Sequence, residues 1–230
     1  MTNHINKTSL RTAALIAGLG LLVMVIAAPF AELFVLPKLI VPHNAAETAK
    51  KLLANKTLFV SCIFGYLITF ICDVVVAWAL YILLKPTNSG LSLLTALFRW
   101  VYTVIAIVSL LNLINVFWLL NNADYLIVFN SGQLNAQLML FIKAFRSGFN
   151  FGIIFFSIHL LLLGYLAFKS NYIPGIFGVL LIVTGLGYLV TSIEPYLFPT
   201  VNVDFAKFTF YGELIFMLWL IIRGSRLKEP

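Results

Sequence analysis

Long apolar stretches separated by short polar or Pro- and Gly-containing segments are the main pattern along this chain of 230 residues. A helix needs roughly 20 mostly apolar residues to cross about 30 Å of hydrocarbon. Six stretches meet this requirement, and we predict transmembrane helices over residues 12–36, 57–84, 91–121, 148–168, 174–193 and 205–222. The predicted fold class is an all-α polytopic transmembrane bundle of six spans, forming a single domain over residues 1–230.

Proline and polar residues set the boundaries of these predicted spans. The turn at residues 85–90 ends the second span, and Pro174 occupies a favoured first helical position for the fifth. We expect Glu194 and Pro195 to close that helix. The apolar stretch 135–168 is longer than a bilayer needs and contains two basic residues, so we expect an interfacial start and a crossing from about residue 148.

A short helix is also predicted in the outer loop between the first and second spans. Asn44 is a favourable N-cap for a helix running to Asn55. Within it, Glu47 and Lys51 are spaced i,i+4, as oppositely charged pairs on a solvated helix surface are. We therefore interpret this loop as carrying a surface helix.

Composition confirms a membrane setting and excludes several classes. Hydrophobic residues make up 62% and charged residues 10% of the chain, and the mean hydropathy is +1.03, which excludes an ordinary soluble protein. The two cysteines, Cys62 and Cys72, lie inside apolar runs, which excludes a disulfide framework. The net charge of +7 does not indicate nucleic acid, because basic residues cluster near the termini beside apolar segments. The expected partner is the lipid bilayer, and no nucleic acid is expected.

The distribution of basic residues predicts the orientation of the chain. Six crossings place both termini on one side, and seven basic residues fall on that side: Lys7, Arg11, Lys85, Lys169, Arg223, Arg226 and Lys228. Five fall opposite: Lys38, Lys50, Lys51, Lys56 and Lys207. Because the cytoplasmic side carries the excess of Lys and Arg, both termini are predicted to be cytoplasmic.

Four ionisable residues lie at similar depths within the predicted spans: Asp73, Arg99, His159 and Glu213. Each is ten to twelve residues from the end of its span on the terminal side, which corresponds to roughly 15 to 18 Å of helix. A charged side chain near the bilayer centre costs about 2.5 to 3.5 kcal/mol on insertion scales, so each needs a partner or a cavity. We therefore predict that they line one polar layer.

Further polar residues support a polar interior. Tyr66 shares a helical face with Asp73, and Tyr102 and Asn112 follow Arg99 at near-helical spacings. A second cluster is expected toward the outer end of the bundle, drawn from Glu32, Asn115, Lys143, Arg146, Asn150 and Glu194. Two ion pairs are possible in this second cluster, Glu32 with Arg146 and Glu194 with Lys143, and the sequence does not choose between them.

Several membrane chemistries require motifs that this sequence lacks. There is no HExxH motif for a zinc peptidase and no Walker A motif for ATP-driven transport. Only His159 lies within a predicted span, whereas a bis-histidine haem needs two axial imidazoles. We therefore predict no metal site and no cofactor.

Short motifs along nearly the whole chain carry a family resemblance: residues 30–35 (FAELFV), 38–42 (KLIVP), 72–74 (CDV), 84–86 (LKP), 111–113 (LNL), 123–126 (ADYL), 159–165 (HLLLLGY) and 212–213 (GE). In these the chain resembles the bacterial membrane-protein family known as domain-of-unknown-function family 4386. The resemblance implies a polytopic protein of the bacterial cytoplasmic (inner) membrane, with no activity or site residues attached.

Three hypotheses for function follow. The first is a polar intramembrane cavity, lined by the four ionisable residues, that binds or moves a small solute or a proton. A small molecule or a lipid is a possible ligand of the protein. The second is a structural or scaffold role in which the same charges are packing bridges. The third is an intramembrane enzyme using Asp73 or Glu213 as its base; no sequence motif favours it. The sequence carries no signal for an oligomeric state.

Overall fold

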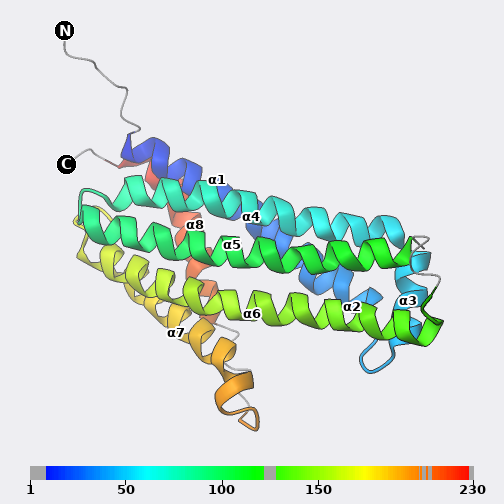
Figure 1. Cartoon of the computed structure of the whole chain (residues 1–230). Coiled ribbons are helices and arrows are strands. Elements are labelled where there is room, and N and C mark those ends of the chain that lie inside the picture. Colours follow the sequence, from blue (N-terminus) through cyan, green and yellow to red (C-terminus); the bar gives the residue numbers. More distant parts are fainter. Residues whose placement is uncertain (1–8, 122–127, 202, 204–205, 207–208, 228–230) are drawn as a thin grey trace. The chain divides into compact units, whose positions relative to one another are not determined.

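All regular structure in the described part of the chain is helical. The structure is a computed structural model that describes residues 9–121, 128–201, 203, 206 and 209–227 (Figure 1). Five helical segments are long and apolar enough to cross a membrane, and α8 is a shorter apolar helix. The helices are α1 (Leu10–Pro29), a π-helix (Phe30–Val35), α2 (Leu36–Leu39), α3 (Ala45–Ala54), α4 (Lys56–Leu84), α5 (Ser89–Leu120), α6 (Ser131–Lys169), α7 (Gly175–Leu197) and α8 (Tyr211–Ile222). The all-helical prediction is confirmed for these residues.

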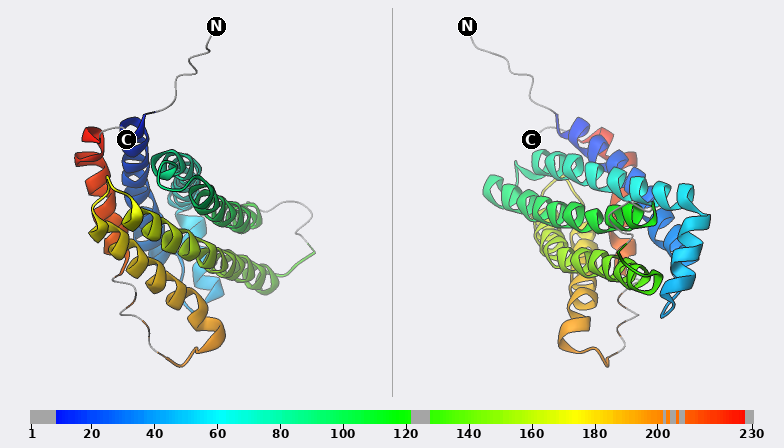
Figure 2. Two further views of the ribbon diagram at one scale, coloured as in Figure 1. Left: turned by 90° about the vertical axis from the view of Figure 1, so that its left-hand side faces the viewer. Right: turned by 45° about the vertical axis from the view of Figure 1, so that its right-hand side comes forward.

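The chain forms two compact units, each assembled from segments of several helices. The first unit contains Met1–Val23, Cys72–Thr103 and Gly152–Pro230, and the second contains Met24–Ile71 and Val104–Phe151. Helices α4, α5 and α6 each contribute one segment to each unit. Within each unit these three segments run side by side (Figures 1 and 2). The assignment of one transmembrane domain stays a prediction.

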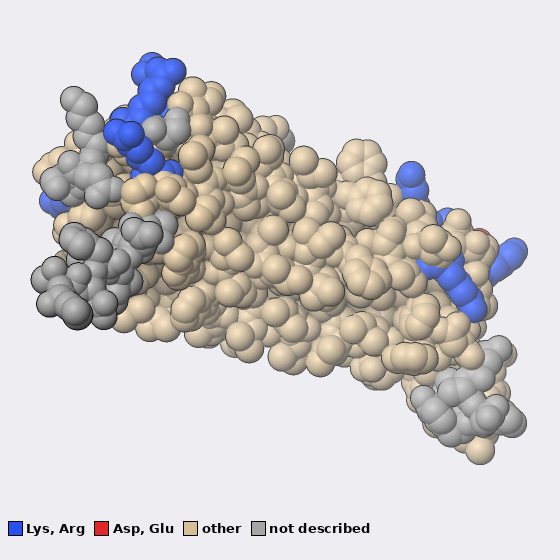
Figure 3. Space-filling view, turned by 90° about the horizontal axis from the view of Figure 1, so that it is seen from above, with Lys and Arg blue, Asp and Glu red and all other residues tan. Residues whose placement is uncertain are grey.

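The surface of the helices is largely apolar. Large hydrophobic side chains such as Ile26, Leu33, Val104 and Ile176 are at least 59% exposed. The face drawn in Figure 3 has broad stretches without any Lys, Arg, Asp or Glu. Soluble proteins rarely expose contiguous apolar areas of this kind, because burying them against lipid or protein is strongly favourable. The chain is therefore a multi-pass membrane protein.

The first apolar segment contains a π-helix that the sequence did not predict. Directly after Pro29, the last residue of α1, the structure has a π-helix over Phe30–Val35 that joins α1 to α2. Proline has no backbone N–H, so the regular hydrogen-bond ladder is already interrupted where the wider turns begin. The helical segment runs from Leu10 to Leu39 in all, beyond the predicted 12–36.

The short helix predicted between the first two apolar segments is confirmed as α3, together with its cap. The side chain of Asn44 accepts a hydrogen bond from the backbone N–H of Glu47 at 2.9 Å. The helix starts at Ala45 and ends at Ala54, and the Asn55 side chain donates to the carbonyl oxygen of Lys51 at the other end. The N-cap that the sequence indicated therefore sets the start of this helix, and the helix ends one residue before the predicted Asn55.

Helix α6 begins well before the predicted crossing near residue 148. It starts at Ser131 because Asn130 and Gln133 cap it reciprocally. The Gln133 N–H donates to the Asn130 side chain at 2.9 Å, and the Asn130 N–H donates to the Gln133 side chain at 3.0 Å. No proline interrupts the following 39 residues. The depth at which α6 enters the membrane stays a prediction.

The last two helices also differ from their predicted limits. Helix α7 continues through Pro195 to Leu197, because a proline in the last turn removes only one hydrogen bond. Helix α8 begins at Tyr211, whereas the predicted span began at residue 205, which lies outside the described residues. Figure 2 shows α7 and α8 packed side by side in the first unit. At Gly212 the two helices meet so closely that an added Cβ would lie 2.7 Å from the carbonyl oxygen of Leu180.

The turn regions at one end of the first unit are tied together by Tyr172, in the loop between α6 and α7. Its hydroxyl donates to the carbonyl oxygen of Leu83 at 2.6 Å and lies 3.1 Å from the hydroxyl of Thr87. Burial raises the pKa of Tyr172, so the phenol keeps the proton that it donates. The loop between α6 and α7 is thereby fixed to the end of α4.

Candidate functional site

Four helices of the first unit bring Asp73, Arg99, His159 and Glu213 into contact. They come from α4, α5, α6 and α8 respectively. Three of the side chains are fully buried, and the side chain of Glu213 is 19% exposed. The structure therefore places the four residues that the sequence singled out in one cluster, which we call the Arg99 cluster.

Arg99 is the centre of this cluster. Its Nε and Nη2 lie 2.8 and 2.7 Å from Oδ1 of Asp73. Its Nη1 lies 3.1 Å from Nε2 of His159 and 3.7 Å from Oε1 of Glu213. The contact with Asp73 is a short charge-assisted bond, whereas the contact with Glu213 is longer than a hydrogen bond. The guanidinium of Arg99 is thus hydrogen-bonded to Asp73 and only within ion-pair distance of Glu213.

The surroundings of His159 define its protonation. Its Nδ1 lies 2.8 Å from the carbonyl oxygen of Thr95, which can only accept, so Nδ1 carries a proton. Nε2 faces an Arg99 nitrogen that can only donate, so Nε2 accepts and carries none. This tautomer, assigned from the hydrogen bonds, makes the imidazole neutral. His159 therefore orients Arg99 without adding charge.

Aromatic rings close the cluster on one side. The Phe156 ring lies 5.1 Å from the guanidinium carbon of Arg99 and 5.6 Å from the His159 ring. The Tyr102 ring, one of the secondary candidates, lies 4.9 Å from Phe156 and is buried. Phe156 and Thr95 were not among the sequence candidates. Their spacings, three residues before His159 and four before Arg99, could have indicated them.

One buried polar atom of the cluster has no hydrogen-bond partner among the described residues. This atom is Oδ2 of Asp73. A buried carboxylate oxygen without a partner costs the full desolvation free energy of that group. The arrangement therefore favours a proton, a cation or a polar ligand at this oxygen.

The outer polar cluster forms differently from the expectation. In the second unit the Tyr66 hydroxyl donates to Oε2 of Glu32, on the π-helix. Glu32 and Arg146 are both exposed, and no ion pair joins them in the described part of the second unit. Among the described residues the Glu32–Arg146 pair is thus not formed, and the hydrogen bond to the Glu32 carboxylate comes from Tyr66. The Asn112 side chain donates to the carbonyl oxygen of Ser109 on its own helix at 3.0 Å.

Glu194, the last of the secondary candidates, belongs to the first unit, in the last turns of α7. Its backbone carbonyl accepts a hydrogen bond from the N–H of Phe198 at 3.0 Å. Lys143, the partner proposed for it, belongs to the second unit. The pairing of Glu194 with Lys143 stays a prediction.

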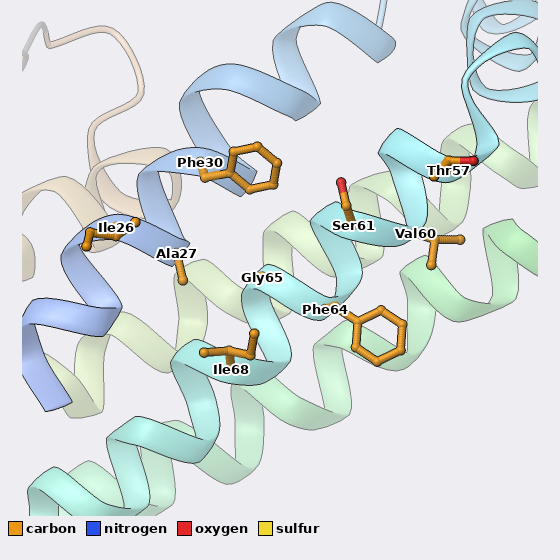
Figure 4. Close-up of a pocket in the computed structure, with 9 residues that line it drawn as sticks. All are labelled: Ile26, Ala27, Phe30, Thr57, Val60, Ser61, Phe64, Gly65 and Ile68. Carbon is orange, nitrogen blue, oxygen red and sulfur yellow. The ribbon is translucent and has the colours of Figure 1, made fainter.

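An apolar groove lies in the second unit between the end of α1 and the start of α4. Figure 4 shows Ile26 and Phe30 on one side and Phe64 and Ile68 on the other, with Gly65 between the helices. The cavity has a volume of about 520 Å³ and no charged residue lines it. The hydroxyl of Ser61, one of its few polar groups, already donates to the carbonyl oxygen of Leu58. The groove is suited to contact with an acyl chain, and no charged side chain lines it that could act as an acid, a base or an ion ligand.

A metal site is not formed by the residues described. Within residues 9–121, 128–201, 203, 206 and 209–227 no three His, Cys, Asp or Glu side chains lie close enough to hold an ion together. Cys62 and Cys72 are both free thiols. The chemistry of the candidate site is thus that of two carboxyl groups, one guanidinium and one neutral imidazole.

These features define a class, that of multi-pass helical membrane proteins with a buried cluster of ionisable side chains. Within that class the chain belongs to the family described as domain of unknown function (DUF4386), whose model matches residues 16–224. The family resemblance in the sequence is confirmed. The chain is also similar to an uncharacterised protein of Archaeoglobus fulgidus, with 36% identity over 168 residues, covering 73% of this chain and 86% of the relative. No solved structure matches the chain significantly.

Proposed function

We propose that this protein spans the bacterial cytoplasmic membrane six times and that its Arg99 cluster binds a proton, coupled to binding or movement of a small solute. The observation that carries the proposal is the pairing of one guanidinium with two carboxyl groups, one of which keeps a buried oxygen without a partner. Intramembrane carboxyl groups in such settings are typical of proton and substrate routes.

The net charge of the Arg99 cluster supports a bound proton. Arg99 contributes one positive charge, and the neutral His159 contributes none. If Asp73 and Glu213 are both ionised, the cluster carries a net charge of −1, and an uncompensated buried charge costs several kcal/mol. One proton shared by the two carboxyl groups makes the cluster neutral. Glu213 is the partly exposed member, so we expect exchange of that proton through Glu213.

The ends of the chain support six crossings. The Nε of Arg11, at the start of α1, donates to the carbonyl oxygen of Leu227, beyond α8, at 2.7 Å. Both ends of the helical region therefore lie on one side of the first unit, which an even number of crossings requires. Five long segments and α8 make six. The excess of basic residues on that side favours cytoplasmic termini.

A structural role is the second candidate, and the position of Glu213 favours it. Glu213 lies in the first turn of α8, where the helix dipole stabilises a negative charge. With Glu213 ionised in that position, the cluster would be a permanent bridge that fixes how α4, α5, α6 and α8 pack.

The pH dependence of stability separates the two candidates. A proton held by the folded cluster at neutral pH is absent from the unfolded chain, where carboxyl groups titrate near pH 4. The folded state then binds more protons, so stability must fall as the pH rises above about 5. We expect the melting temperature of the wild type in detergent to fall over this range, and that of Glu213→Gln to fall much less. Equal pH profiles, with the variant uniformly less stable, would support the structural role.

A further inference from the structure

A cavity in the second unit combines basic side chains with apolar walls. It has a volume of about 620 Å³ and lies between the α2–α3 connection and the first half of α6. Its lining residues are Pro37, Ile40, Pro42, His43, Ala45, Met139, Ile142, Lys143 and Arg146. Two basic residues and a histidine are among them, and no acidic residue is. The cavity is therefore suited to an anion attached to an apolar body.

The two basic side chains are available for a ligand. Lys143 and Arg146 are spaced i,i+3 on α6, which places them on one face of the helix. Both are exposed, and among the described residues neither makes an ion pair with a carboxylate. Arginine and lysine together are the residues that bind phosphate most often, the first through a planar fork and the second as a point charge.

The backbone at the opposite wall adds a second attraction for an anion. Ala45, which lines the cavity, is the first residue of α3, and His43 precedes the Asn44 cap. The Asn44 side chain accepts from the N–H of Glu47, while the N–H groups of Ala45 and Ala46, in the same first turn, have no acceptor within this ten-residue helix. The positive end of the helix dipole thus lies at the same cavity as Lys143 and Arg146.

The position of the lining residues along α6 is consistent with the level of the lipid headgroups. Arg146 and Lys143 lie 23 and 26 residues before Lys169, where α6 ends. At 1.5 Å per residue this is roughly 35 to 39 Å of helix. The hydrocarbon core measures about 30 Å and the bilayer with its headgroups about 40 to 45 Å. If Lys169 lies at one interface, the two basic residues lie among the headgroups of the opposite one.

We propose that this cavity binds the phosphate headgroup of an anionic phospholipid, held by Lys143 and Arg146, with its apolar part against Ile40, Met139 and Ile142. A lipid is favoured over a soluble phosphate compound because six of the nine lining residues are apolar and because the length of α6 is consistent with headgroup depth. This inference does not depend on the Arg99 cluster, since none of that cluster's residues lines the cavity.

Native mass spectrometry of the full chain in detergent, titrated with phosphatidylglycerol or phosphatidylcholine, tests the proposal. We expect the wild type to bind phosphatidylglycerol more tightly. Each basic residue near an anionic headgroup contributes about fivefold, so Lys143→Gln with Arg146→Gln should weaken that binding by about 25-fold. The charge-matched control, Lys50→Gln with Lys51→Gln on α3, removes the same charge away from the cavity and should retain the preference.

Further measurements distinguish a lipid headgroup from a soluble phosphate compound and control for misfolding of the variants. The double variant Lys143→Arg with Arg146→Lys changes the same two positions but keeps both charges, so it should keep the preference for phosphatidylglycerol. A loss of binding seen only in the Gln variant is then due to the missing charge and not to misfolding. Equal binding of the two lipids by the wild type, or an equal loss in the α3 control, would overturn the proposal. Displacement of phosphatidylglycerol by glycerol phosphate at equal concentration would also overturn it, in favour of a soluble ligand.

Discussion

Replacing Arg99 with methionine should destabilise the protein by about 3 to 5 kcal/mol, a large part of the roughly 5 to 15 kcal/mol by which folded proteins are typically stable. The substitution leaves the buried Asp73 and the largely buried Glu213 without their shared cation. Methionine keeps an unbranched apolar chain in place of the arginine stem, so the main loss is the guanidinium with its charge and its contacts to Asp73 and His159. Denaturant unfolding, with yield and gel-filtration profile as companion measurements, gives the difference directly.

Two matched variants show whether charge is the cause. Asp73→Asn in the Arg99→Met background removes the carboxylate closest to the guanidinium and should restore part of the stability. Arg146→Met removes an exposed arginine that has no ion pair among the described residues, and should change stability by no more than about 0.5 kcal/mol. A stable Arg99→Met protein, within about 1 kcal/mol of the wild type, would contradict the central role of Arg99.

Gly178→Ala should be the most damaging conservative change outside the cluster. A Cβ at Gly178 would lie 2.6 Å from the carbonyl oxygen of Gly164 and 2.6 Å from the backbone nitrogen of Phe168. Neither backbone atom can move without displacing α6, so α6 and α7 must separate. Overpacking of this kind costs typically 1 to 3 kcal/mol, measurable as a lower melting temperature in detergent.

Gly175 provides the control on the same helix. A Cβ there would meet the ring of Phe168 at 3.4 Å, an ordinary contact. Gly175→Ala should leave the melting temperature close to that of the wild type, since it removes only the conformational freedom of a glycine. Equal effects at residues 175 and 178 would mean that α6 and α7 are not packed as closely as the structure indicates.

The sequence predicted which segments are helices and which side chains meet in the Arg99 cluster. Apolar length marks each helix, because the hydrocarbon thickness imposes it. Depth marks the cluster, because Asp73, Arg99, His159 and Glu213 are all ten to twelve residues from the same side. Charged groups at that depth must find one another or a cavity. Their functional role stays a prediction.

Other features depend on how each helix is rotated about its own axis. Lipid is as apolar as a protein core, so apolar residues surround these helices and their periodicity does not indicate which face meets which neighbour. The sequence therefore did not show that Tyr66 donates a hydrogen bond to Glu32. It also did not show that Arg99 lies closer to Asp73 than to Glu213. The π-helix after Pro29 was equally hidden, because proline predicts an interruption but not the form it takes.

Infrared difference spectroscopy of the carboxyl C=O stretch tests the protonated cluster most directly. At neutral pH an exposed carboxyl group is ionised, so a protonated carboxyl band reports a buried proton. The proposal predicts such a band in the wild type and in the control Glu47→Gln, whose side chain lies on α3 and is only partly buried, and its loss in Asp73→Asn or Glu213→Gln. A wild-type spectrum at neutral pH with no protonated carboxyl band, or one that survives both cluster substitutions, would contradict it.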